Sequence, residues 1–115
     1  MKFESLTDLV QVFANEYSIP GNIVLMTGQG LDPGIKKIFD FIDCETIFVS
    51  DTPGADLVVD YFDFPFEESS FDIIINFTDS DVLHLLKPNG HALFKGEILN
   101  GVEYHSIKNE TFTVI

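Results

Sequence analysis

The residues best suited to acid–base or metal chemistry are three histidines and one cysteine, and they stand far apart in the sequence. His84, His91 and His105 show no metal-ligand spacing, and Cys44 has no companion thiol, so no metal site is expected. His84 is a candidate general base, because an imidazole titrates near neutral pH, but a half-exposed surface histidine is the simpler interpretation. The sequence therefore assigns no catalytic residue.

Carboxylates are plentiful, but their clusters fit structural roles. Glu67-Glu68 and Asp79-Asp81 suit solvated loop and helix-cap positions better than paired catalytic acids. The chain carries 19 acidic and 6 basic residues, for a formal net charge of −13. Charge of that sign repels phosphate backbones, so direct nucleic-acid binding is not expected. The charge is consistent with solubility, with a basic protein partner, or with mimicry of a nucleic acid by the acidic stretch Asp56 to Asp72.

The composition indicates that the chain folds into a single domain. Hydrophobic residues make up 45% of the 115 residues and include 12 Phe, so we expect a single folded domain over residues 1–115. The lone Cys44 allows no internal disulfide. Met1 to Asp8 lacks a signal pattern, and no apolar stretch is long enough to span a bilayer. A cytoplasmic protein without membrane contact is the expectation.

Helical periodicity predicts two amphipathic helices. The first follows Ser5 and Asp8, which are spaced as a helix cap, and the second begins at Pro33, behind Asp32, and ends near Cys44. Each helix places four apolar side chains on one face: Leu6, Leu9, Val10 and Phe13 in the first, and Ile35, Ile38, Phe39 and Ile42 in the second. Both faces need a sheet to pack against.

Short apolar runs predict that sheet. Asn22 to Met26 and Thr46 to Ser50 flank the second helix, which is long enough to make the two strands parallel. Phe71 to Phe77 is the strongest strand signal and is expected at the centre. The run Asp56 to Asp60 follows its predecessor after only a turn, so it should either pair antiparallel or lie outside the sheet.

The C-terminal third predicts a short helix, a strand and a hairpin. The helix is capped by Asp79 or Ser80 and continues through Leu86, after which Lys87 to Gly90 stops it and His91 to Leu99 forms a strand. A terminal antiparallel hairpin follows, with Tyr104 to Ile107 and Thr111 to Val114 as its two strands. Only the short helix is then available to cover the second face of the sheet, so part of that apolar face is expected to be a binding surface.

Four segments, taken together, resemble successive motifs of class I S-adenosylmethionine-dependent methyltransferases. They are VLMTGQG (24–30), FVSD (48–51), DYFDFPFEESSFDIIIN (60–76) and LKPNGHALF (86–94). The resemblance covers about residues 22 to 95. It implies an α/β fold: a three-layer Rossmann-like sheet of the methyltransferase type, with a reduced set of helices and the C-terminal antiparallel hairpin.

The resemblance also implies where S-adenosylmethionine would bind. In this family the cofactor lies at the carboxyl ends of adjacent parallel strands, where Gly28 and Gly30 would let the backbone approach it and Asp51 would hold the ribose hydroxyls. Asp60, with the backbone of Tyr61, falls where the family contacts the adenine. No catalytic residue and no metal ligand follow from the resemblance.

The sequence departs from the family pattern at the same site. Met26 stands where the family usually has an acidic residue, and Asp32, expected as a helix cap, stands where a third glycine is common. Base-methylating members often carry an Asn- or Asp-Pro-Pro-aromatic motif after the fourth strand. Here the matching residues are Asn76-Phe77-Thr78-Asp79, of which only the Asn agrees, so no base-methylating site is predicted.

Three functions remain as hypotheses. The first is a degenerate, non-catalytic methyltransferase-like domain that acts by binding a protein partner or by self-association. The second is a minimal active S-adenosylmethionine-dependent methyltransferase, completed where necessary by a partner subunit. The third is an acidic inhibitor that imitates a nucleic acid and occupies a basic protein.

Overall fold

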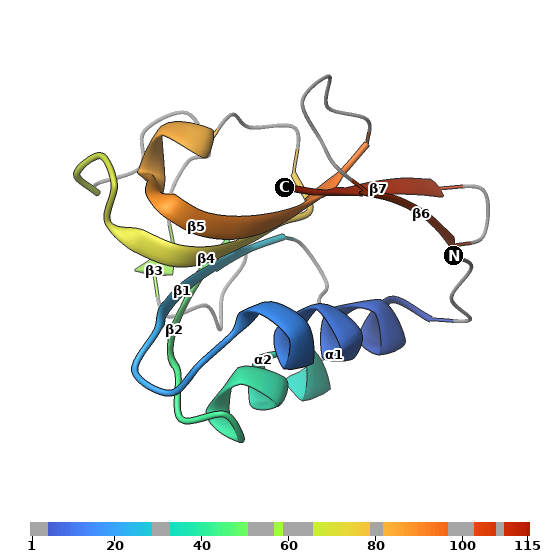
Figure 1. Ribbon diagram of the computed structural model, residues 1–115, viewed down its shortest axis with the longest axis horizontal. Coiled ribbons are helices and arrows are strands. Elements are labelled where there is room, and N and C mark those ends of the chain that lie inside the picture. Colours follow the sequence, from blue (N-terminus) through green and yellow to red (C-terminus); the bar gives the residue numbers. More distant parts are fainter. Residues whose placement is uncertain are drawn as a thin grey trace.

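A computed structural model of the chain describes residues 5–28, 33–50, 57–58, 66–78, 82–96, 103–107 and 110–115. Within these ranges the strands form one seven-stranded sheet of order β3-β2-β1-β4-β5-β7-β6 (Figure 1). The strands from β3 to β5 run parallel, and β7 runs antiparallel to β5 and to β6. The elements in chain order are α1 (Leu6–Tyr17), β1 (Ile23–Thr27), α2 (Pro33–Asp40), β2 (Glu45–Ser50), β3 (Leu57–Val58), β4 (Phe71–Asn76), the 3-10 turn η1 (Leu83–Leu85), β5 (Leu86–Lys95), β6 (Glu103–Ile107) and β7 (Glu110–Val114).

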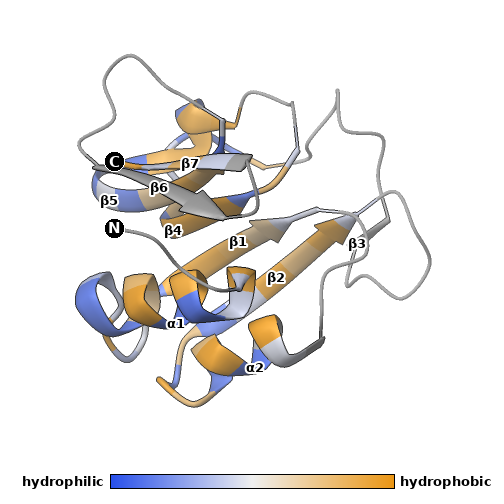
Figure 2. Cartoon of the chain, turned by 90° about the vertical axis from the view of Figure 1, so that its right-hand side faces the viewer, coloured by the Kyte–Doolittle hydropathy of each residue, from blue (hydrophilic) through white to orange (hydrophobic). Residues whose placement is uncertain are grey.

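The sheet separates two hydrophobic cores. Side chains alternate between its faces, so that Val24 and Met26 of β1 point into the core under the helices while Leu25 points into the other. The middle strands are apolar on both faces because each face is covered (Figure 2). The predicted central strand is confirmed: β4 lies between β1 and β5 and is the fourth of the seven strands.

The two helices cover the same face of the sheet, as Figure 1 shows. Their predicted inward faces are confirmed, and Ser5 caps α1 by accepting a hydrogen bond from the N–H of Asp8 at 3.2 Å. The second helix ends at Asp40, earlier than predicted. Its last turn tightens because Asp43 N–H donates to the carbonyl of Asp40, and Asp43 then adopts a left-handed backbone with φ of 59°.

The third strand corrects an expectation. Leu57–Val58 pairs parallel with β2. Both predicted alternatives, antiparallel pairing and a position outside the sheet, were therefore wrong. A parallel connection of a dozen residues is needed when the chain must return along a whole strand. Here only the last two residues of β2 are paired, with Val49 level with Leu57, and the six intervening residues 51–56 suffice for so short a return.

The start of β5 also differs from the prediction. Of the predicted helix, residues 79–81 lie outside the described part of the chain, and the described remainder holds a single 3-10 turn, Leu83–Leu85. The strand β5 begins at Leu86, so Lys87 to Gly90 lie inside it. Between the pairs Phe71↔Leu86 and Ile73↔His91, β4 advances by two residues and β5 by five. Three surplus residues therefore bulge from the ladder, and the turn-forming sequence Lys87-Pro88-Asn89-Gly90 makes the bulge.

The second face of the sheet is buried, which overturns the expectation of a bare binding surface there. Leu25, Val49 and Ile74 are each 0% exposed on this side. Among the described residues, Phe66 and the segment from Val82 to Leu85 pack against them. The predicted hairpin is confirmed, and its strand β7 extends the helix-covered core with Phe112 and Val114. None of the described helices is long and apolar enough to cross a bilayer.

Candidate functional site

The carboxyl ends of β1 and β2 meet at one edge of the sheet. The two strands are adjacent and parallel, with Thr27 level with Val49, so the chain leaves both strands at the same edge. Gly28 follows β1 directly and is buried. Backbone without a side chain at such a position allows close approach of a nucleotide. This confirms the strand arrangement on which the predicted adenosyl site depends.

Most of the predicted cofactor residues lie outside the described part of the chain. Gly30, Asp51, Asp60 and Tyr61 are among the undescribed residues, so of the predicted cofactor-binding set only Gly28 is placed. Asp51 directly follows Ser50, the last residue of β2, in the sequence. The roles assigned to these residues therefore remain predictions.

Met26 occupies the position where the resembling family has an acidic residue. Its side chain is 0% exposed and belongs to the core between the sheet and the two helices. An apolar thioether in that core accepts at most a weak hydrogen bond. This position therefore offers no carboxylate.

Asn76 closes the carboxyl end of β4 with a compact set of hydrogen bonds. Its Oδ1 accepts from the hydroxyl of Thr27 at 2.7 Å, from the N–H of Thr78 at 3.0 Å and from the hydroxyl of Thr78 at 2.6 Å. Asn76 is 1% exposed, and Phe77 N–H donates to the carbonyl of Thr27 at 3.0 Å. The amide oxygen is thus committed to joining β1 and β4, which matches the interpretation of Asn76 as a strand end.

The histidines do not gather at this edge. His84 lies in η1, whose following residue Leu86 pairs with Phe71 at the start of β4, so His84 is at the amino edge and the general-base hypothesis was wrong about its place. The ring of His91 stacks on Tyr17 at 4.4 Å between centroids. His105 lies in β6. Within the described ranges, no three His, Cys, Asp or Glu side chains lie close enough to share a metal ion.

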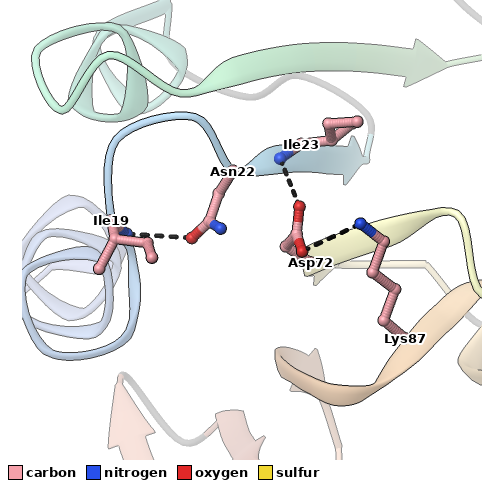
Figure 3. A network of polar contacts seen from close by, with 5 residues as sticks. All are labelled: Ile19, Asn22, Ile23, Asp72 and Lys87. Carbon is pink, nitrogen blue, oxygen red and sulfur yellow. Dashed lines mark hydrogen bonds and ion pairs between the residues drawn. The ribbon is translucent and has the colours of Figure 1, made fainter.

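Sequence reasoning missed a polar network at the amino edge of the sheet (Figure 3). Asp72 Oδ2 accepts from the N–H of Ile23 at 2.9 Å, and Asp72 Oδ1 lies 3.2 Å from Lys87 Nζ. Asn22 Oδ1 accepts from the N–H of Ile19 at 3.0 Å. One signal was present in the sequence: Asp72 interrupts the apolar run Phe71 to Ile75, and a carboxylate there requires partners.

A pocket of about 540 Å³ opens at this amino edge. It is lined by the end of α1 and the loop after it, by the start of β4, and by the bulge of β5. Nearby, the thiol of Cys44 donates to the carbonyl of Ile19 at 3.4 Å. Burial raises the pKa of Cys44 above its ordinary value, a hydrogen bond with the backbone of Asn22 partly opposes this, and the charges of Asp43 and Asp72 raise the pKa by smaller amounts. The thiol is therefore a buried neutral group.

Comparison with known proteins identifies the fold. No known family model matches the sequence, and no curated protein matches it. Among solved structures, the cyclase SpnF superposes on 89% of this chain with a TM-score of 0.63 and 13% identity. A 1,6-didemethyltoxoflavin-N1-methyltransferase from Burkholderia thailandensis, with bound S-adenosylhomocysteine, covers 96% of this chain with a TM-score of 0.61 and 12% identity. An S-adenosylmethionine-dependent methyltransferase from Aquifex aeolicus covers 96% with a TM-score of 0.63 and 12% identity.

These similarities show the fold of S-adenosylmethionine-dependent methyltransferases. The predicted fold class is therefore confirmed. This chain spans 52% of SpnF and 61% of the Burkholderia enzyme, but 92% of the Aquifex protein. At sequence identities of 12 to 13%, these similarities show the fold but not the activity, because one fold hosts many activities.

Proposed function

We propose that this chain is a degenerate methyltransferase-like domain, which binds S-adenosylmethionine or its product S-adenosylhomocysteine weakly, transfers no methyl group, and acts through a protein partner. The observation that carries the cofactor part is the parallel pairing of β1 with β2, which brings Gly28 and the end of β2 to one edge. In an open parallel sheet, ligands bind outside the carboxyl ends of the strands.

The described part of the edge fits an adenosyl group in one respect and lacks a contact in another. Gly28 offers backbone without a side chain at the end of β1. Gly30 would continue that loop, Asp51 would hold the ribose, and Asp60 with Tyr61 would meet the adenine. Met26 supplies no carboxylate for the amino-acid end of the cofactor, so binding should be weak. When bound, the cofactor would supply an electrophilic methyl group.

The loss of catalysis is proposed on the state of Asn76. Its Oδ1 already accepts three hydrogen bonds from Thr27 and Thr78, so it has little capacity left to orient an acceptor amine. Of the histidines, His84 and His91 lie toward the amino edge, and His105 lies on the outermost strand β6, three strands away from β4. Methyl transfer to nitrogen or oxygen generally needs a proton acceptor or a polarising oxygen.

Calorimetry with S-adenosylmethionine and S-adenosylhomocysteine tests the cofactor part. We expect saturable binding with a dissociation constant of about 10–500 μM, weakened at least tenfold by Asp51→Ala. Asp43→Ala makes the same change of charge at the opposite edge of the sheet and should leave binding unchanged. No heat at millimolar cofactor, or equal weakening by both substitutions, would refute the proposed adenosyl site.

A second candidate, a minimal active methyltransferase, is favoured by the similarity to 92% of the Aquifex aeolicus methyltransferase. The two candidates differ in turnover. Conversion of S-adenosylmethionine to S-adenosylhomocysteine is measured in a cell extract with the wild-type chain and with Asp51→Ala. Conversion that requires Asp51 would establish the enzyme and contradict the loss of catalysis.

A further inference from the structure

The amino edge of the sheet carries exposed apolar side chains, one of which lines the pocket described above. Phe41 is 88% exposed and Ile19 is 64% exposed, the two highest values among the large hydrophobic side chains that the structure describes. Phe41 lies in the turn between α2 and β2, and Ile19 lies in the loop between α1 and β1. Single exposed apolar residues are common on protein surfaces, whereas apolar side chains grouped near a pocket indicate a contact surface.

Backbone hydrogen bonds hold these two connections side by side. Gly21 N–H donates to the carbonyl of Asp43 at 3.0 Å, and Glu45 N–H donates to the carbonyl of Asn22 at 2.9 Å. Gly21 has φ of +90°, a conformation that glycine adopts without strain. Ile19 also lines the pocket, so the loop between α1 and β1 connects the pocket to the turn that carries Phe41. We call this surface, made by Ile19, Phe41 and the pocket, the amino-edge surface.

Acidic side chains surround the amino-edge surface on two sides. Exposed carboxylates precede and follow Phe41 at Asp40, Asp43 and Glu45, and Glu67 and Glu68 come just before the pocket residue Ser69. The same elements also carry lysines: Lys36 and Lys37 in α2, and Lys87 at the start of β5. Lys87 is ion-paired with Asp72, and Lys37 is one helical turn from Phe41. Acids therefore prevail around an apolar centre.

The acidic side chains around an apolar centre indicate which kind of ligand this surface would bind. An apolar side chain fits the pocket beside Ile19, Phe41 offers a second apolar contact, and cations fit the carboxylates around them. A second copy of this chain is a poor occupant, because two molecules of net charge −13 repel each other and would bring the same acids together.

We propose that the amino-edge surface binds a basic segment of a partner protein, with one large apolar side chain of that segment in the pocket and its Lys or Arg side chains against Asp40, Asp43, Glu67 and Glu68. This inference rests on the part of the proposed function that invokes a partner, and not on the cofactor. The edge lies opposite Gly28, at the other end of β1, about 16 Å away along the strand.

Selection from a random twelve-residue phage-displayed peptide library on the immobilised full-length chain tests the inference. We expect the enriched sequences to combine two or more Lys or Arg with Leu, Ile, Phe or Met. The most enriched peptide is then synthesised, and its affinity is measured by fluorescence anisotropy. Phe41→Ser and Ile19→Ser should each weaken it at least tenfold, whereas Val12→Ser, at a 43% exposed position on α1, should change it less than twofold.

Three results would overturn the inference: no enrichment, enriched peptides without basic residues, or unchanged affinity for Phe41→Ser. Light scattering of the chain alone supplies a fourth. A dimer that Phe41→Ser dissociates would assign the surface to a second copy instead. Circular dichroism checks that the variants fold, which is expected because both side chains are exposed. Cofactor calorimetry on Phe41→Ser should match wild type, so failure of the adenosyl site and failure of this surface are told apart.

Discussion

Asp72 allows a quantitative test of what stabilises the amino edge. Its carboxylate accepts a hydrogen bond from the partly buried N–H of Ile23 and pairs with Lys87. A hydrogen bond to a charged group contributes about 1.5–3 kcal/mol to stability. The ion pair joins side chains that are 42% and 25% exposed, for which solvent screening leaves about 0.2–1 kcal/mol. The backbone hydrogen bond should therefore dominate.

Three substitutions separate the two contributions. Asp72→Ala removes both and should lower the free energy of unfolding by about 2–3 kcal/mol. Lys87→Met removes only the ion pair and should cost less than about 1 kcal/mol. Asp72→Asn keeps an oxygen that can accept from Ile23, and removing one negative charge from a chain of net charge −13 relieves repulsion, so its cost should also stay below about 1 kcal/mol.

Urea unfolding followed by circular dichroism gives these differences, provided that the slopes agree among the variants. Repeating the series at 1 M NaCl should shrink the effect of Lys87→Met and leave most of the effect of Asp72→Ala, because salt screens the exposed pair. If Lys87→Met costs as much as Asp72→Ala, or Asp72→Asn costs as much as Asp72→Ala, the ion pair dominates and the reasoning fails.

Three further substitutions test the core, the bulge and the thiol by urea unfolding. Ile74→Ala, in the central strand, should cost about 2–5 kcal/mol, whereas Val12→Ala on the exposed face of α1 should cost less than about 0.5 kcal/mol; similar costs would contradict the assigned core. Gly90→Ala should cost about 1–3 kcal/mol, because its Cβ would lie 2.8 Å from the carbonyl oxygen of Asp72, and an unchanged midpoint would mean that the bulge gives way. The raised pKa of Cys44 stabilises the native state below the unfolded thiol pKa of about 8.5, so the stability of wild type relative to Cys44→Ala should fall as pH rises above that value, and a rise would refute the assigned direction.

Much of the fold was predictable because its signals are local. Helical spacing identified the inward faces of α1 and α2, and the continuous apolar run of β4 indicated a strand covered on both sides. The errors fall where local signals compete with tertiary pairing. The sequence Lys87 to Gly90 has the residues of a turn, yet pairing of β5 with β4 retains it as a bulge. Leu57–Val58 pairs with β2 over only two residues. For so short a pairing, the length of the connection does not decide whether the strands run parallel or antiparallel.

The candidate sites were predictable to different degrees. The carboxyl edge follows from the order of parallel strands, so Gly28 could be placed from the sequence. The amino-edge surface was not foreseen, because it depends on contacts between distant segments: Ile23 meets Asp72 across 49 positions, and Cys44 meets Ile19 across 25. The exposure of Phe41 was equally hidden, since the end of α2 depends on the backbone conformation of Asp43.

The bulge of β5 gives the protein a segment whose length can vary independently of its core. Pairing with β4 resumes at His91, so removing or adding a residue between Lys87 and Gly90 leaves the inward and outward alternation of Ala92, Leu93 and Phe94 in place. Homologous chains could therefore differ in length here while keeping the same sheet. The exposed middle of the bulge, between Pro88 and Asn89, is therefore a suitable point at which to insert a reporter or an affinity tag, while Lys87 and Gly90 keep their contacts with Asp72.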